Sequence, residues 1–123
     1  MATQFKKALI ADDSPTTRKF IGLTLKSLGF DVLLAEDGME ALEMLPREEF
    51  SLIITDLNMP NIDGLEFIRQ IRANDFLKKV PVIVLSSIDD AGIKTACMEA
   101  GASSFLVKPF NPAKIKYEVS KVI

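Results

Sequence analysis

Short runs of aliphatic and β-branched residues recur five times along the chain, and almost no polar side chain interrupts them. Runs of this length and composition are typical of strands that are buried on both faces of a parallel sheet. The predicted strands span residues 8–11, 32–35, 52–55, 82–85 and 105–107.

The segments between these runs carry apolar residues at the three- and four-residue spacing of amphipathic helices. The predicted buried faces comprise Ile21, Leu25 and Leu28; Ile93, Ala96, Cys97 and Ala100; and Ile115, Val119 and Val122. Two further helices are expected over about residues 39–45 and 65–73.

Capping residues mark where several of these helices begin and end. Ser14 and Asn111 each precede a proline, as an N-cap side chain does before a proline at the first helical position. Gly29 and Gly101 stand where helices should end. Strands and helices therefore alternate strictly, which predicts a parallel sheet with helices on both faces. No linker, repeat or composition change divides the chain, so we expect a single domain over residues 1–123.

Polar side chains follow four of the five predicted strands. Asp12 and Asp13 follow the first strand, Asp56 the third, Ser86 the fourth and Lys108 the fifth. In an open parallel sheet, ligands bind beyond the carboxyl ends of the strands, where the strand order reverses. We therefore expect these three carboxylates, the hydroxyl and the ammonium group to converge at one edge of the sheet.

Three carboxylates so near to one another would each raise the pKa of the others unless a cation neutralises their charge. Oxygen-only ligands favour Mg²⁺, which is commonly held by one or two carboxylates together with phosphate oxygens. A carboxylate can also act as a nucleophile toward phosphorus and form an aspartyl phosphate. The predicted site therefore points to phosphoryl chemistry.

The composition removes several classes of function. The chain has no histidine, which excludes hydrolases with a histidine base and any phosphohistidine carrier. Its single cysteine, Cys97, can form no internal disulfide and has no partners for a zinc site. A net charge of −2 gives no reason to expect nucleic-acid binding. No apolar run could span a bilayer, and the N-terminal MATQFKK lacks the apolar segment of a secretory signal, so we expect a cytoplasmic protein without membrane insertion.

Four motifs together identify a resemblance to a known family. They are ADDS at residues 11–14, ITDLNMPNIDGLEF at 54–67, VLSS at 84–87 and KPF at 108–110. Over nearly all of its length the chain resembles the response-regulator receiver domain, and its size resembles that of the stand-alone chemotaxis regulators of the CheY type. The resemblance implies a doubly wound (βα)5 fold, flavodoxin-like or CheY-like, with a five-stranded parallel sheet in the order 2-1-3-4-5.

The resemblance also implies a metal site. By position, Asp56 is expected to be the phosphoacceptor and also a metal ligand. Asp13 is expected to bind Mg²⁺ directly, Asp12 partly through water, and Asn58 through its backbone carbonyl, with Mn²⁺ as a substitute metal.

Further roles follow from the same resemblance. Lys108 is expected to contact one phosphoryl oxygen and Ser86 to donate its hydroxyl to another. Phe105 occupies the aromatic switch position, and the Lys108-Pro109 peptide bond is expected to be cis.

The implied function is that of a phosphoacceptor in a two-component system, phosphorylated by a histidine kinase, with self-phosphorylation and self-dephosphorylation but no other enzyme activity. Asn58 and Ile88 border the path of the hydrolytic water and are expected to tune the lifetime of the phosphoryl group. The output partner is either a flagellar motor switch protein, which the motifs favour, or a histidine phosphotransfer protein of a phosphorelay. A phosphatase is a further expected partner, and we expect a monomer.

Ordinary structural roles remain open for several of these residues. Asp12 and Asp13 could merely cap the helix that starts near residue 15. Ser86 and Ser87 could cap the helix after residue 88, and Phe105 could be a plain core residue. Cys97 lies on an apolar helical face and is interpreted as core packing.

Two functions of other classes fit the sequence less well. Phosphatases of the haloacid-dehalogenase type place a spaced aspartate pair after the first strand, whereas this chain has DDSPTT there and its candidate nucleophile after the third. A flavodoxin-like electron carrier needs a phosphate loop and aromatic rings around the flavin, but the chain has no tryptophan and only Tyr117 as tyrosine.

Overall fold

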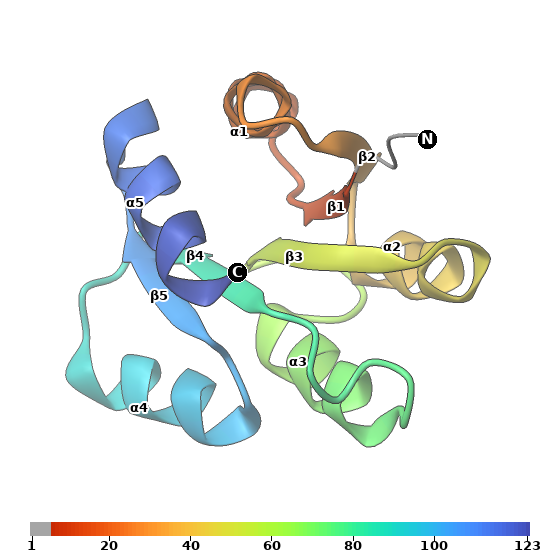
Figure 1. Ribbon diagram of the computed structural model, residues 1–123. Coiled ribbons are helices and arrows are strands. Elements are labelled where there is room, and N and C mark those ends of the chain that lie inside the picture. The colour runs from red at the N-terminus through yellow and green to blue at the C-terminus, as the bar shows by residue number, and fades with distance from the viewer. Residues whose placement is uncertain (1–5) are drawn as a thin grey trace.

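The computed structural model describes residues 6–123, in which strands and helices alternate along the chain as predicted (Figure 1). The elements are β1 (Lys7–Ala11), α1 (Pro15–Ser27), β2 (Asp31–Ala35), α2 (Gly38–Met44), the short 3₁₀ helix η1 (Leu45–Arg47), β3 (Phe50–Asp56), α3 (Gly64–Ala73), β4 (Val82–Ser86), α4 (Ala91–Ala100), β5 (Ser104–Val107) and α5 (Pro112–Val122). The expectation that MATQFKK is no secretory signal falls mostly on residues outside this range. Among the described helices, none has the length and apolar character needed to cross a membrane.

The five strands form one parallel sheet in the order β2-β1-β3-β4-β5, which confirms the predicted fold. In Figure 1, α1 and α5 cover one face of the sheet, and α2, α3 and α4 cover the other. The strand order reverses between β1 and β3, because the chain leaves β1 toward β2 and returns on the other side. This switch point is where ligands are expected in such a sheet.

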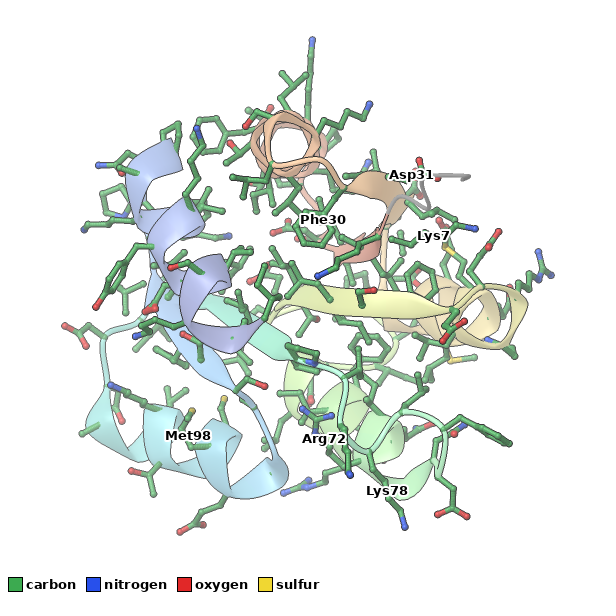
Figure 2. The ribbon with its side chains drawn as sticks, viewed as in Figure 1. Lys7, Phe30, Asp31, Arg72, Lys78 and Met98 are labelled. Atoms are coloured by element: carbon green, nitrogen blue, oxygen red, sulfur yellow. The ribbon has the colours of Figure 1, made fainter. Side chains whose placement is uncertain are left out.

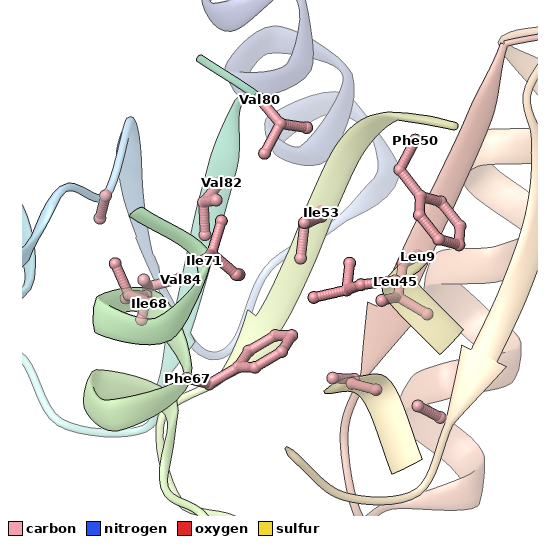
Figure 3. Close-up of a cluster of buried hydrophobic side chains, with 14 of the residues drawn as sticks. Leu9, Leu45, Phe50, Ile53, Phe67, Ile68, Ile71, Val80, Val82 and Val84 are labelled. Atoms are coloured by element: carbon pink, nitrogen blue, oxygen red, sulfur yellow. The ribbon is translucent and has the colours of Figure 1, made fainter. Parts of the chain in front are cut away.

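Two clusters of buried apolar side chains fill the space between the sheet and its helices. Under α2, α3 and α4, Figure 3 shows Phe67, Ile68 and Ile71 of α3 beside strand residues such as Ile53. The cluster under α1 and α5 comprises Ala8, Ile10, Ile21, Leu25, Phe30, Leu52, Ile54, Ile83, Leu85, Leu106, Ile115 and Val119. The sheet is therefore held rigidly from both sides, which fixes the strand ends that carry the polar residues.

The structure corrects the predicted burial of two elements. β2 is an edge strand, with Asp31 exposed and Leu34 at 44% exposure, so it is not buried on both faces as its apolar run predicted. Leu28 does not belong to the buried face of α1, because the helix ends at Ser27 and Leu28 is 41% exposed.

The predicted helix caps are confirmed. Ser14 Oγ accepts a hydrogen bond from the Thr17 amide at 3.3 Å, and Asn111 Oδ1 accepts one from the Lys114 amide at 2.9 Å. The Gly29 and Gly101 backbones have φ angles of 93° and 118° just beyond α1 and α4. Glycine adopts such left-handed angles without the steric cost that a side chain brings.

Candidate functional site

Three aspartate side chains meet at the switch point of the sheet. Asp12 and Asp13 directly follow β1, and Asp56 is the last residue of β3, the neighbouring strand. One oxygen of each carboxylate lies within 4.8 Å of the others. Asp12 and Asp56 are buried, whereas Asp13 is exposed, so the cluster opens to solvent on one side.

Asp12 has one satisfied and one unsatisfied carboxylate oxygen. Its Oδ1 accepts a hydrogen bond from the Ser14 amide at 2.8 Å, while the buried Oδ2 has no hydrogen-bond partner within residues 6–123. Burial raises the pKa of this carboxyl, and the Ser14 amide and the charge of Lys108 offset only part of that increase. Since buried polar atoms are nearly always paired in native proteins, an unpaired buried carboxylate oxygen fits a ligand for a cation.

Asp56 is held at the end of β3 by its own backbone neighbours. The Leu57 amide donates to Asp56 Oδ1 at 2.9 Å and also to the Leu85 carbonyl of β4 at 3.0 Å. Burial is the main factor that raises the pKa of Asp56, and the nearby Asp12 charge raises it further. A Cβ atom on Gly64 would lie only 2.4 Å from the Asp56 carbonyl oxygen, so the start of α3 can approach this strand end only as glycine.

Lys108 brings a positive charge to the two buried carboxylates. Its Nζ lies 3.8 Å from both Asp12 Oδ2 and Asp56 Oδ1, which is an ion-pair distance but too long for a hydrogen bond. The Lys108 amide donates to the Ser86 carbonyl at 2.7 Å, which ties the segment after β5 to the end of β4. The Lys108-Pro109 bond is cis, as predicted.

Ser86 is the last residue of β4 and is fully buried, close in sequence to the exposed Ile88. Its Oγ accepts a hydrogen bond from the Ile88 amide and donates one to the Ile88 carbonyl, both at 3.0 Å. Neither Ser86 nor Ser87 caps α4, so that alternative is wrong. Asp90 caps the helix by accepting a hydrogen bond from the Ile93 amide at 3.0 Å, because α4 begins later than the serine pair suggested.

The remaining predicted residues surround the carboxylates at a greater distance. Asn58 is exposed in the loop after β3. Phe105 pairs with Val84 across β4 and β5 and packs, half-buried, against the core under α2 to α4, as a plain core residue would. Cys97 is a free thiol at 1% exposure, which agrees with its interpretation as core packing.

Arg18 is a further residue of the site, which no sequence motif indicated. Its Nη1 donates to the Asp12 carbonyl oxygen at 2.6 Å, and its Nη2 lies 3.9 Å from a Glu36 carboxylate oxygen. The guanidinium therefore steadies the turn that carries Asp12 and Asp13. Arg18 lies in the first turns of α1, but its sequence position alone does not indicate this contact.

The aspartates do not serve as the cap of α1, because the Ser14 side chain occupies that position. The buried carboxylates of Asp12 and Asp56 and the exposed carboxylate of Asp13 form a donor set made of oxygen atoms alone. The Lys108 ammonium group lies beside this set and is not a metal ligand. Such a set suits a hard divalent cation such as Mg²⁺ or Mn²⁺.

Comparison with known proteins agrees with this geometry. The family model of the response regulator receiver domain matches residues 8–120. Chemotaxis protein CheY1 of Helicobacter pylori strain J99 is 37% identical over 119 residues, which cover 95% of this chain and 96% of that protein.

Solved structures show the same likeness. The chemotaxis response regulator CheY4 of Vibrio cholerae superposes with a TM-score of 0.93 at 34% identity, covering 98% of this chain and all of that one. The receiver domain of the sensor histidine kinase PA1611 of Pseudomonas aeruginosa, whose structure has a magnesium ion coordinated in the active-site cleft, gives a TM-score of 0.87 at 30% identity, covering 97% of this chain and 98% of that one. The chain therefore belongs to the response regulator receiver domain family and is homologous to the CheY chemotaxis proteins.

Proposed function

We propose that Asp56 accepts a phosphoryl group from a histidine kinase, with a divalent metal ion held by Asp12, Asp13, Asp56 and the backbone carbonyl of Asn58. The observation that carries this proposal is the cluster of three carboxylates within 4.8 Å, in which Asp12 Oδ2 is buried without a hydrogen bond. A bound Mg²⁺ ion, or Mn²⁺ in its place, supplies positive charge to the phosphoryl oxygens during transfer.

Asp56 acts as the nucleophile in this reaction. One of its carboxylate oxygens attacks phosphorus, the new O–P bond forms as the P–N bond to the kinase histidine breaks, and the histidine nitrogen keeps the bonding electron pair. Burial raises the pKa of Asp56, so the Lys108 ammonium at 3.8 Å helps to keep the carboxylate ionised. With a small phosphodonor, the same attack gives self-phosphorylation, and water completes the cycle by self-dephosphorylation.

Lys108 and Ser86 bind the phosphoryl group once it is in place. The ammonium neutralises one oxygen, and the Ser86 hydroxyl donates to another after it leaves the Ile88 carbonyl. Phosphorylation adds roughly −1.5 to −2 charges at pH 7, which favours this rearrangement. Phe105 then turns inward and alters the surface from α4 to α5. Asn58 and Ile88 border the water path and set how long the aspartyl phosphate lasts.

The output is chemotaxis, and the partner is a flagellar motor switch protein. This choice is supported by the named chemotaxis function of the H. pylori and V. cholerae relatives. The receiver domain acts as a monomer in the cytoplasm, and a phosphatase ends the signal.

A second candidate is a phosphorelay intermediate that passes phosphate to a histidine phosphotransfer protein. The similarity to a receiver domain of a sensor histidine kinase supports it. Affinity for a motor-switch peptide and for a phosphotransfer protein, each measured with and without beryllofluoride, separates the two candidates.

Replacement of the nucleophile tests the phosphoacceptor directly. Asp56→Asn should abolish acid-labile phosphate incorporation from a histidine kinase, because an amide oxygen cannot form the acyl phosphate. The matched control is Asp75→Asn, which removes an exposed carboxylate whose one ion pair among the described residues is with Lys78 at 2.8 Å, and it should be labelled like the wild type. Undiminished labelling of Asp56→Asn would exclude Asp56 as the phosphoacceptor.

A further inference from the structure

The loop between β3 and α3 carries the proposed carbonyl ligand of Asn58, and its two ends are fixed by backbone hydrogen bonds. At its start, the Leu57 amide donates to the Leu85 carbonyl of β4 at 3.0 Å. At its end, the Gly64 amide donates to the Leu57 carbonyl at 2.8 Å. These bonds hold Leu57 and Gly64 but do not by themselves fix the residues between them, among which Asn58 is exposed.

A side-chain contact from another part of the chain reaches the middle of this loop. Asn61 Nδ2 donates to Asp37 Oδ2 at 3.1 Å, across 24 positions of sequence. The other oxygen of the same carboxylate, Asp37 Oδ1, accepts a hydrogen bond from the Glu40 amide at 2.8 Å and so caps α2. One aspartate therefore joins the start of α2 to the loop that follows β3.

The backbone on both sides of this contact is closely fitted. Asn61 has a φ of 72°, a left-handed angle that asparagine tolerates better than other residues with side chains. A Cβ atom on Gly38 would lie 2.7 Å from the Ile62 carbonyl oxygen, so the loop packs directly on the first residue of α2. The contact is thus part of a closely packed interface between the loop and the start of α2.

We propose that Asp37 and Asn61 form a positioning pair, which holds the β3–α3 loop so that the Asn58 carbonyl faces the metal ion. This inference rests on the proposed function, because it needs a metal ion at the carboxylate cluster. Mg²⁺ demands nearly ideal octahedral geometry, so a mobile carbonyl ligand binds it less tightly than a carbonyl that is held in position. Asp37 and Asn61 are not part of the carboxylate cluster and act only through the loop.

Two substitutions remove the contact while keeping the local structure. Asn61→Gly deletes the amide but accepts the left-handed backbone angle. Asp37→Ser keeps a good N-cap for α2 but is too short to cap the helix and reach Asn61 together. Each should weaken Mg²⁺ binding roughly three- to tenfold, at or below the lower end of what the loss of an outer-shell contact costs. The double variant should bind Mg²⁺ as tightly as the single variants do, because each single substitution already removes the same contact.

Calorimetric Mg²⁺ titration of the full chain measures these affinities, and thermal unfolding in EDTA shows whether the fold is kept. Hydrogen exchange without metal provides a second measurement, in which the backbone amides of Asn58, Met59 and Ile62 should exchange faster in Asn61→Gly while those of β3 do not. Glu43→Gln is the matched control, because it removes a charge from an exposed position of α2, and it should change Mg²⁺ affinity less than about twofold.

Failure of this inference can be told apart from failure of the proposed function. If the wild type binds Mg²⁺ and both single variants bind it equally well, the positioning role is overturned while the metal site stands. Additive losses in the double variant, or a loss in Glu43→Gln as large as that in Asn61→Gly, would also overturn it. A wild type that binds no Mg²⁺ would overturn both.

Discussion

Asp12 combines complete burial with a carboxylate oxygen that no hydrogen bond satisfies. Burial raises its pKa above the ordinary value of 3.8. The folded protein then holds this proton more tightly than the unfolded chain does. Stability therefore falls as the pH rises from 3.8 to the raised native pKa, and it stays lower above that range. At neutral pH the metal-free protein thus bears an electrostatic cost at this residue, which a bound cation would relieve.

Removing this charge should separate stability from metal binding. We expect Asp12→Asn to raise the free energy of unfolding of the metal-free protein by about 1 kcal/mol at neutral pH, and by less near pH 4. Asparagine keeps an oxygen for the Ser14 amide, so the turn should be preserved. Urea denaturation in EDTA at both pH values measures the effect. Mg²⁺ should then stabilise the wild type but hardly the variant, and a loss of stability that is equal at both pH values would contradict the electrostatic origin.

Sequence reasoning reached the aspartates and Lys108 because parallel strands end at the same edge of a sheet. The residue after each strand is then close to the others, whatever the helices do. The contact of Arg18 with the Asp12 carbonyl depends on how α1 is rotated, and the pairing of Asn61 with Asp37 joins two loops 24 positions apart. Neither arrangement leaves a periodic pattern in the sequence, so only the structure shows them.

Among the elements, α3 and α4 are joined at their C-terminal ends by Arg72 (Figure 2). Its Nε donates to the Gly101 carbonyl at 2.9 Å, and its Nη1 donates to the Leu77 and Lys78 carbonyls at 3.0 and 3.1 Å. Burial lowers the pKa of this guanidinium, but hydrogen bonds to three carbonyl oxygens compensate for its partial removal from water. A Cβ atom on Gly101 would lie 2.6 Å from the Arg72 side chain, so the arginine fills the space beside that glycine.

Loss of the Arg72 hydrogen bonds should destabilise the fold without altering the proposed phosphorylation site. Arg72→Ala should lower the free energy of unfolding by about 2–3 kcal/mol, because it removes packing and leaves carbonyl groups of two connections without donors. Urea denaturation measures the change. Arg69→Ala on the same helix is the control. The Arg69 side chain is 60% exposed, and its Nη1 forms a surface ion pair with Glu66 Oε2 at 3.8 Å. This substitution should therefore lower the free energy of unfolding by at most about 0.5 kcal/mol. Equal effects of the two substitutions would show that the Arg72 hydrogen bonds do not hold α3 and α4 together.

The edge strand β2 illustrates what periodicity alone cannot reveal about an element. Its apolar run resembles those of the central strands, but its place in the sheet leaves Leu34 largely exposed. Burial on both faces requires a neighbour on each side and helices above and below, and these follow from strand order rather than from local sequence. The resemblance to a family supplied that order, which the composition and spacing of the runs did not.

In the molecule as a whole, the proposed phosphoacceptor and the proposed partner-binding surface lie on different elements. Asp56 ends β3, whereas the proposed output surface runs from α4 to α5. The link between them is the end of β4, where the Ser86 hydroxyl bonds to Ile88 just before α4 begins. If phosphorylation draws this hydroxyl away, the segment before α4 loses two hydrogen bonds at once. A partner that prefers the resulting surface must in turn favour the phosphorylated site, because coupling between two binding events is reciprocal.

That reciprocity gives a quantitative test of the switch. If beryllofluoride and Mg²⁺ tighten the binding of a motor-switch peptide by about tenfold, a saturating amount of the peptide should tighten beryllofluoride binding by the same factor. Ser86→Ala removes the hydroxyl that links the two regions and should reduce both factors together, while Ser87→Ala, at an exposed neighbour with no described hydrogen bond, should leave them unchanged. Fluorescence anisotropy of a labelled peptide and calorimetry of beryllofluoride measure the two sides. If Ser86→Ala keeps the full coupling, the signal must pass from Asp56 to the output surface by another route, such as the hydrogen bond that the Lys108 amide donates to the Ser86 carbonyl.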